Sequence, residues 1–370
     1  MRPGSIAVYL LALGGLLAGS AVARGDATSV NAAVNGFDAS ELTNRQLAGQ
    51  RIVCGFSGRR APQSLLNVVA RGELAGVILF EDNIGGKASV QAMNRAIQAT
   101  DRPPGLRQPV LISVDQEGGL VKRLPGPPKA SAQVMGARGA KYSRSQGAAT
   151  GRSLRSYGFN VDLAPVLDVA RPSGFIADQR RAFGSKPGRV GSAGSAFARG
   201  LEAEGVAATA KHFPGLGSTS ANTDLRPATI RLPAKTLRRI DLAPYERFIA
   251  AGGDLVMVGS ARYPALGAPK LPASQSKSVM RKELRGRLGF TGVTITDSLE
   301  TPSIRRSGSA AKVAVRTAGA GADLLLYVHC DAGMRAAQAL RRGLASGKLK
   351  RGAFEAAVDR VLALRTSLEP

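Results

Sequence analysis

The sequence is poor in several residue types that mark particular classes of protein. Its 370 residues include no Trp, two Cys and two His, and only 5% are aromatic. Two cysteines exclude a disulfide-rich scaffold and a cysteine-based zinc site. The two histidines and scattered carboxylates show no metal-ligand spacing, and basic and aromatic residues do not alternate as in nucleic-acid platforms. We therefore expect no metal, no cofactor and no nucleic-acid partner.

Acidic residues are scarce relative to basic ones. The chain has 51 Lys and Arg against 26 Asp and Glu, which gives a formal net charge of +25. The arginines are scattered along the sequence, so one interpretation is long-range attraction to anionic envelope polymers. The alternative is a compositional bias without a partner. With 44% hydrophobic and 21% charged residues, the chain is able to form a full globular core.

Long apolar runs are absent except near the N-terminus. Arg2 precedes an apolar stretch at 6–17 that is too short to span a bilayer, and Ala-Val-Ala at 21–23 fits a cleavage site. This pattern predicts a signal peptide at 1–23, and hence a secreted or cell-envelope protein without stable membrane insertion after cleavage. The alternative is an uncleaved anchor.

Short apolar runs alternate with segments of helical length in the remainder of the chain. Near-continuous apolar runs are typical of parallel strands covered on both faces. Eight such units predict a single α/β domain, a (β/α)₈ TIM barrel at 41–368, preceded by a mature extension at 24–40. The alternative, a doubly wound sheet, needs a glycine-rich phosphate-binding turn that 55–58 does not provide. The predicted strands are 51–56, 76–80, 110–115, 159–165, 207–212, 255–259, 292–297 and 323–329, and the clearest amphipathic helices are 236–251, 334–345 and 353–364.

Polar residues follow directly after these apolar strands. Lys211 and His212 end the fifth strand, and Asp297 ends the seventh. A TIM barrel gathers the carboxyl ends of its strands at one face, where its chemistry takes place. Cys54 and Cys330 also lie near strand ends, so they either pair if the sheet closes or remain two separate thiols. The other polar residues in such positions are Glu81, Asp82, Asp115, Gln116, Glu117, Asp168, Ser260, Arg262 and His329.

Six motifs occur in order along this frame. Together they resemble the catalytic barrel of glycoside hydrolase family 3, specifically the single-domain bacterial β-N-acetylhexosaminidases, from about Leu47 to Leu364. The motifs are Gly-Val-Ile-Leu-Phe at 76–80 with Asn83, Val-Asp-Gln-Glu-Gly-Gly at 114–119, Asn-Val-Asp-Leu-Ala-Pro-Val-Leu-Asp-Val at 160–169, Arg-Ala-Phe-Gly-Ser at 181–185, Lys-His-Phe-Pro-Gly at 211–215 and Thr-Asp-Ser-Leu at 296–299.

The resemblance implies a role for Asp297. It matches the family's nucleophile, which attacks the anomeric carbon and forms a covalent glycosyl-enzyme. A carboxylate suits this step because it is anionic at neutral pH and stabilises an oxocarbenium-like transition state. The alternative for Asp297 is a helix N-cap.

The resemblance also implies a group of residues that hold the sugar. These positions combine a carboxylate that accepts from hydroxyls with cations that donate to them. The alternatives are a simple ion pair between Asp115 and Lys211 and a purely structural His212. Glu117 is expected to support the following Gly-Gly turn rather than to catalyse. The sugar-holding residues are Asp115, Arg123, Arg181, Lys211 and His212.

The chain departs from the family pattern in the loop after the fifth strand. In these hexosaminidases the loop carries an Asp-x-His pair whose His is the general acid/base, whereas here Asn222 replaces the Asp and Asp224 replaces the His. Asp224 is therefore the first candidate acid/base, with a pKa raised by Asp297 and by a closed loop. Glu81 or Glu300 is the second possibility, and a site that binds sugar with little or no turnover is the third.

The sequence as a whole predicts an exported retaining glycosidase. The resemblance implies terminal β-linked N-acetylglucosamine in cell-wall or chitin-like glycan fragments as its carbohydrate substrate. Two alternatives remain: a non-catalytic or weakly active glycan-binding barrel, and a β-glucosidase-type specificity.

Overall fold

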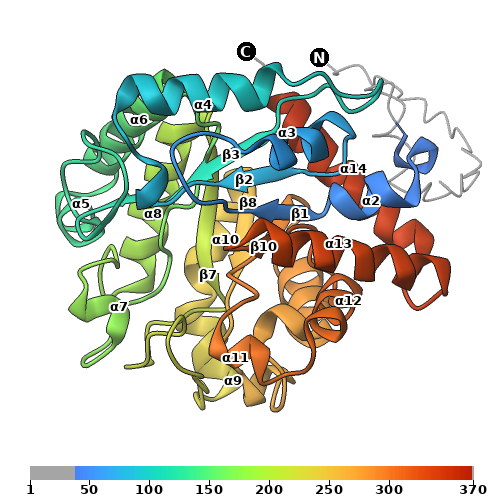
Figure 1. Ribbon diagram of the computed structural model, residues 1–370. Helices are drawn as coiled ribbons and strands as arrows, with labels where there is room; N and C mark the ends of the chain where they lie inside the picture. The colour runs from blue at the N-terminus through green and yellow to red at the C-terminus, as the bar shows by residue number, and fades with distance from the viewer. Residues whose placement is uncertain (1–37, 369–370) are drawn as a thin grey trace, which may run out of the picture. The chain divides into compact units, whose positions relative to one another are not determined.

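Eight parallel strands form one closed sheet in the computed structural model, which describes residues 38–368 (Figure 1). The strand order is β10-β1-β2-β3-β6-β7-β8-β9, and a parallel bridge between Ile295 and Leu324 joins β9 to β10 and closes the sheet. The predicted TIM barrel is thus confirmed, whereas the predicted signal peptide lies outside the described residues. The strands are β1 (Ile52–Cys54), β2 (Gly76–Ile78), β3 (Leu111–Val114), β6 (Val161–Asp162), β7 (Ala207–Phe213), β8 (Leu255–Val258), β9 (Val293–Thr296) and β10 (Leu325–Tyr327).

Helices surround the barrel on the outside (Figure 1). The amphipathic segment predicted at 236–251 is helical but divided, because Pro244 lacks an N–H and lies in the first turn of a new helix, α10. Within residues 38–368, no helix has the length and apolarity needed to cross a membrane. The main helices are α2 (Asn44–Gly49), α3 (Gln63–Ala70), α4 (Lys87–Ala99), α5 (Ala132–Arg138), α6 (Ala140–Tyr157), α7 (Phe175–Asp178), α8 (Pro187–Glu202), α9 (Ala234–Thr236), α10 (Ala243–Ala250), α11 (Pro302–Arg305), α12 (Ala310–Ala320), α13 (Cys330–Ala345) and α14 (Arg351–Ser367). A hairpin of β4 (Gln116–Gly118) and β5 (Val121–Lys122) and π-helical turns at Leu237–Asp241 and Ser278–Arg287 complete the fold.

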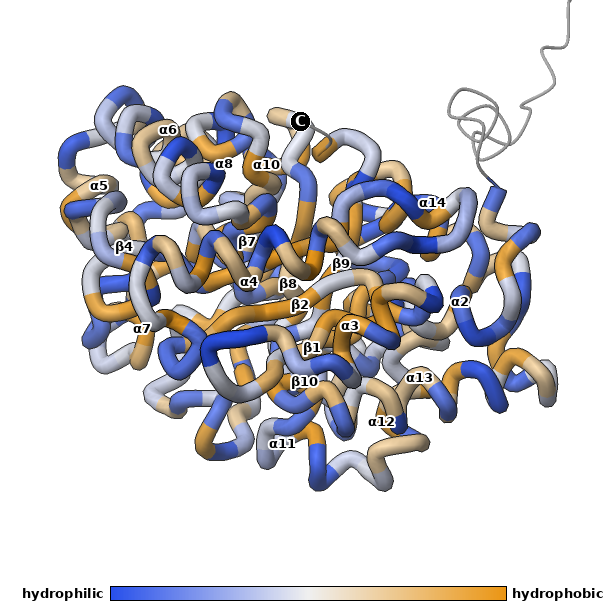
Figure 2. The backbone as a smooth tube through the Cα atoms, turned by 45° about the horizontal axis from the view of Figure 1, so that its top comes forward, coloured by the Kyte–Doolittle hydropathy of each residue, from blue (hydrophilic) through white to orange (hydrophobic). Residues whose placement is uncertain are grey.

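Two apolar layers account for the continuous hydrophobic character of the strands. Val53 belongs to the cluster inside the barrel, whereas its neighbours Ile52 and Cys54 belong to the cluster between barrel and helices. Successive strand side chains point to opposite faces, so a strand covered on both faces has apolar residues on both and few polar positions. Figure 2 shows the result, with hydrophobic strands inside helices of mixed hydropathy.

A disulfide joins the first strand of the barrel to the helix that follows the last strand. Cys54 ends β1, Cys330 begins α13 after β10, and their Cα atoms lie 4.9 Å apart. Because β1 pairs with β10, closure of the sheet brings the two cysteines together. Of the two interpretations that the sequence left open, the bridge is the one found.

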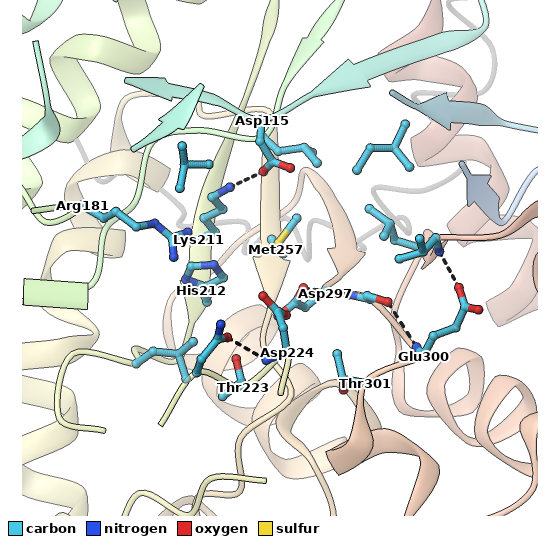
Figure 3. Close-up of a pocket in the computed structure, with 18 of the residues that line it drawn as sticks. Asp115, Arg181, Lys211, His212, Thr223, Asp224, Met257, Asp297, Glu300 and Thr301 are labelled. Carbon is cyan, nitrogen blue, oxygen red and sulfur yellow. Dashed lines mark hydrogen bonds and ion pairs between the residues drawn. The ribbon is translucent and has the colours of Figure 1, made fainter. Parts of the chain in front are cut away.

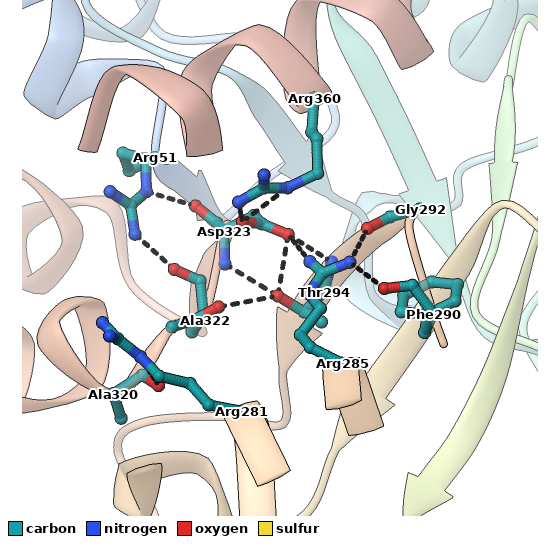
Figure 4. A network of polar contacts seen from close by, with 11 residues as sticks. Arg51, Arg281, Arg285, Phe290, Gly292, Thr294, Ala320, Ala322, Asp323 and Arg360 are labelled. Carbon is teal, nitrogen blue, oxygen red and sulfur yellow. Dashed lines mark hydrogen bonds and ion pairs between the residues drawn. The ribbon is translucent and has the colours of Figure 1, made fainter. Parts of the chain in front are cut away.

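The end of the barrel where the strands begin carries a buried charge network (Figure 4). The Asp323 carboxylate accepts hydrogen bonds from Arg285 at 2.6 Å, from Arg360 at 2.7 Å and from the main-chain N–H of Thr294 at 2.8 Å. Burial opposes ionisation, but the two guanidinium groups and these hydrogen bonds outweigh it and lower the pKa of Asp323. Arg51, also buried, donates to the main-chain carbonyl of Asp323 at 2.6 Å.

Candidate active site

A cavity of about 490 Å³ opens at the carboxyl ends of the strands (Figure 3). The loops after β3, β7 and β9 each contribute charged side chains to its wall. A TIM barrel is expected to place its site at this face. All seven residues that the sequence singled out line the cavity, namely Asp115, Arg123, Arg181, Lys211, His212, Asp224 and Asp297.

Buried ion pairs organise one side of the cavity. The Lys211 ammonium lies 2.6 Å from Asp115 and 2.7 Å from Glu117. Glu117 also accepts two hydrogen bonds of 2.8 Å from the Arg181 guanidinium. Burial acts to raise the pKa of Glu117, but Arg181 and Lys211 lower it to about 2. Glu117 therefore positions both cations. The sequence pattern indicated only support of the following turn, because the two partners of Glu117 lie far from it in the chain.

His212 is held from behind by a buried carboxylate. Its Nδ1 lies 2.7 Å from Oδ2 of Asp168, whose Oδ1 accepts the main-chain N–H of Leu216 at 2.7 Å. A carboxylate at Nδ1 fixes the ring orientation and leaves Nε2 as the nitrogen free for other partners. His212 is therefore anchored in the structure and also lines the cavity.

Asp297 follows β9 directly and lines the cavity. Its Oδ1 accepts the main-chain N–H of Ser298 at 2.7 Å, but the following helix, α11, has Thr301 as its N-cap, so Asp297 is not a helix cap. Burial, followed by the negative charge of Asp224, raises the pKa of Asp297 to about 6, while His212 acts to lower it. The charge of Asp224 thus disfavours ionisation of Asp297.

Asp224 lies in the loop between β7 and α9. Its main-chain N–H donates to the side-chain oxygen of Asn222 at 2.9 Å, so Asn222 shapes the turn that carries Asp224. Asp224 is exposed. The expectation that a closed loop shields it is therefore wrong for this conformation. Figure 3 shows the loop bringing Asp224 next to Asp297.

The two other candidate acids, Glu81 and Glu300, each pair with a basic side chain. Glu81 is exposed and pairs with Arg123 at 3.0 Å. Glu300 lines the cavity, lies 2.9 Å from Nδ1 of His329 and accepts that residue's main-chain N–H at 3.0 Å. The sequence placed His329 at a strand end but gave no sign of its pairing with Glu300, because the two residues meet only through the fold. No group of three or more His, Cys, Asp or Glu able to hold a metal occurs within residues 38–368.

Comparison with known proteins agrees with this geometry. Residues 43–364 match the model of the glycosyl hydrolase family 3 N-terminal domain. The chain belongs to glycoside hydrolase family 3. It is similar to a secreted glycosyl hydrolase of Arthroderma benhamiae, with 36% identity over 87% of this chain and 93% of that one. It is also similar to the β-hexosaminidase of Xylella fastidiosa, with 33% identity over 75% and 83% of the two chains.

Solved structures support the same family assignment. A family 3 β-N-acetylglucosaminidase from Paenibacillus sp. matches with a TM-score of 0.81 and 33% identity, covering 88% of this chain and 63% of that one. The β-N-acetylhexosaminidase of Beutenbergia cavernae matches with a TM-score of 0.80 and 28% identity over 88% and 99% of the two chains. This family 3 protein is therefore a glycoside hydrolase of the β-hexosaminidase-like kind.

Proposed function

We propose that this enzyme is an exported retaining glycosidase that removes terminal β-linked N-acetylglucosamine from cell-wall or chitin-like glycans. Asp297 is the nucleophile and Asp224 the general acid/base. The observation that carries this proposal is the electrostatic coupling of the two carboxylates in one cavity of the barrel. The names of the Paenibacillus and Beutenbergia proteins support the choice of sugar.

In the first step, an Asp297 oxygen forms a bond to C1 of the sugar. The bond from C1 to the leaving-group oxygen breaks, and that oxygen takes the proton of Asp224. Before the step the two carboxyl groups must share one proton, with Asp297 ionised and Asp224 protonated. Burial and the negative charge of Asp224 raise the pKa of Asp297 to about 6, so Asp297 is still mostly ionised at neutral pH, as the attack on C1 requires.

In the second step, water replaces the protein at C1. Asp224, now ionised, accepts a proton from the water molecule. The oxygen of that water forms a bond to C1 while the ester bond between C1 and Asp297 breaks. The products are the free sugar with its original anomeric configuration and the enzyme in its starting protonation state. The exposure of Asp224 suits this step because water reaches it directly.

The buried cations fix the sugar for these steps. Lys211 and Arg181 are held by Glu117, so their remaining N–H groups are oriented before the sugar enters. Asp115 can accept from hydroxyls, and so can Nε2 of the neutral His212 ring, because Nδ1 carries the hydrogen that faces Asp168. A hydrogen bond between a charged group and a neutral hydroxyl is stronger than one between two neutral groups. Arg123 lines the cavity and pairs with the exposed Glu81, and it would donate to a further hydroxyl of the sugar.

A secreted relative and the disulfide support an extracytoplasmic location. Disulfides persist in oxidising compartments and are rare in the cytosol. The bridge between Cys54 and Cys330 is consistent with the exported enzyme that the sequence at 1–23 predicts.

One set of assays tests the proposal. Purified enzyme is incubated with an aryl β-N-acetylglucosaminide and an aryl β-glucoside, alongside Asp297→Ala, Asp224→Ala and His329→Ala. We expect turnover of the first substrate, none in Asp297→Ala, and a loss of about 10²- to 10⁴-fold in Asp224→Ala. Preference for the glucoside would indicate β-glucosidase specificity. Full activity in Asp297→Ala would contradict the nucleophile assignment.

The exposure of Asp224 also supports a second candidate, a glycan-binding barrel with little or no turnover. In that case the wild type hydrolyses neither substrate but still binds N-acetylglucosamine oligomers. The His329→Ala variant separates a further outcome: if it loses more activity than Asp224→Ala, the pair of His329 and Glu300 supplies the proton instead.

A further inference from the structure

Helices α2, α3 and α13 lie on one flank of the barrel (Figure 1). A second hollow, of about 410 Å³, is formed by residues on and next to these helices and is lined by charged side chains of predominantly one sign. We call it the arginine groove. Four arginines and one carboxylate, Glu73, line it, together with apolar Val68, Met334 and Ala337 and polar Gln338. The arginines are Arg45, Arg71, Arg335 and Arg341.

The single carboxylate leaves most of this positive charge uncompensated. Glu73 lies 3.2 Å from Arg71 and 3.9 Å from Arg45. Arg335 and Arg341 have no ion pair or side-chain hydrogen bond within residues 38–368. Their guanidinium groups are therefore available to an anionic ligand.

A third hollow, of about 270 Å³, lies between the arginine groove and the catalytic cavity. It shares His329 with the catalytic cavity and shares Val68 and Met334 with the arginine groove. Helix α13 borders both flank hollows, and its stretch from Cys330 to Arg341 covers about 16 Å, at ~1.5 Å per residue. A chain leaving the catalytic cavity past His329 therefore reaches the arginines along one helix.

We propose that the arginine groove binds a carboxylate-bearing polysaccharide, so that the enzyme is held on an acidic glycan while its barrel acts on a terminal sugar. A guanidinium group matches a carboxylate with two parallel hydrogen bonds. Val68 and Met334 offer apolar surface to the faces of sugar rings. No aromatic side chain lines the groove, so it lacks the base-stacking surface that is typical of sites for single-stranded nucleic acid.

The test measures binding of polygalacturonate, a polymer of carboxylate-bearing sugars. The double variant Arg335→Glu/Arg341→Glu is compared with the control Arg342→Glu/Lys348→Glu. The control changes the net charge of the protein by the same amount, but at two exposed positions nearby that do not line the groove. We expect the groove variant to bind about tenfold or more weakly, from loss of two charge-assisted contacts, and the control to lose no more than about threefold. Both variants should keep wild-type kcat/KM on the aryl substrate.

Other results would overturn the inference. Equal weakening in both variants would show that only the overall charge of the protein attracts the polymer. Tighter binding of duplex DNA or polyphosphate than of polygalacturonate, lost in the groove variant, would assign the groove to another ligand. The inference extends the proposed function, but the two fail separately: polygalacturonate binding does not require turnover, and aryl hydrolysis does not require the groove.

Discussion

Asp297 and Asp323 lie at opposite ends of neighbouring strands and experience opposite electrostatic environments. Asp323 accepts hydrogen bonds from two arginines, and its pKa is lowered despite full burial. Asp297 has no arginine or lysine within hydrogen-bond distance in the described part of the chain, and its pKa is raised to about 6. The difference separates a carboxylate that stabilises the fold from one that is left free to react.

The contrast extends to a further buried acid, Asp162, which lies on β6 close to Asp115, Glu117 and Lys211. One of its oxygens accepts the main-chain N–H of Gln116 at 3.0 Å, and the other has no hydrogen-bond partner within residues 38–368. Burial raises the pKa of Asp162 to about 8. The catalytic end thus contains incompletely compensated carboxyl groups, which cost stability and are typical of functional sites.

The largest effect expected from this comparison is on turnover at the catalytic end. Asp297→Asn should lower kcat by about 10³-fold or more, because an amide cannot form the glycosyl-enzyme. Between pH 3.8 and about 6 the folded enzyme keeps a proton at Asp297 that the unfolded chain has released, so ionised Asp297 costs stability at pH 7. The Tm of Asp297→Asn at pH 7 should therefore equal or exceed that of the wild type, which calorimetry measures.

At the end of the barrel where the strands begin, substitution of Asp323 should lower stability and leave turnover unchanged. Asp323→Asn leaves Arg285 and Arg360 without their carboxylate and should lower the free energy of unfolding by about 3–5 kcal/mol, with kcat per folded molecule unchanged. Because the folded pKa is lowered, the stabilisation is fully present above pH 3.8 and is lost as pH falls below that value. Urea unfolding measures the change, with the exposed Asp331→Asn as the control. A loss below about 1 kcal/mol would contradict this account of the network.

The disulfide stabilises the barrel without charge. Replacing Cys54 and Cys330 by Ser should lower the free energy of unfolding by about 2–5 kcal/mol, because the bridge closes a loop spanning 276 positions of sequence. Urea unfolding of the oxidised wild type and of the variant checks this. Free-thiol titration confirms that the wild type is oxidised. Equal free energies of unfolding for the variant and the wild type would then show that β1 and β10 stay paired without the disulfide.

The coupled carboxylates predict a pH profile. Asp297 must be ionised to attack C1, so kcat/KM for a glycan substrate should rise by about tenfold per pH unit as pH approaches about 6 from below. At higher pH, where the acid/base loses its proton, the decline should be weaker for an aryl substrate, because a good leaving group needs less proton donation. Identical alkaline limbs in the wild type and in Asp224→Ala would exclude Asp224 as the proton donor.

The smallest expected effect concerns phosphate. An anionic base at Asp224 repels an anionic acceptor in the second step, so water should be preferred to phosphate. Adding phosphate at constant ionic strength should leave the rate unchanged and yield no sugar phosphate, as chromatography of the products would show. A steep increase in rate would contradict the assignment of Asp224.

The architecture could be predicted from the sequence because apolar runs and strand ends are local patterns. Even there the boundaries shifted: the strand expected at 159–165 is only Val161–Asp162, although single main-chain hydrogen bonds to the neighbouring strands continue as far as Pro165. Pairings between residues that are distant in the sequence could not be predicted, because they depend on the fold. Examples are Glu117 with Arg181 and Glu300 with His329. The exposure of Asp224 depends on how its loop folds, which no local pattern determines.

Covalent trapping tests the central assignment most directly. The enzyme is incubated with a 5-fluoro N-acetylglucosaminyl fluoride, which forms a glycosyl-enzyme that hydrolyses slowly, and is then digested for peptide mass spectrometry. We predict one adduct, on the peptide containing Asp297, and none in Asp297→Asn. An adduct on another carboxylate, or no adduct from an enzyme that turns over the aryl substrate, would contradict the account.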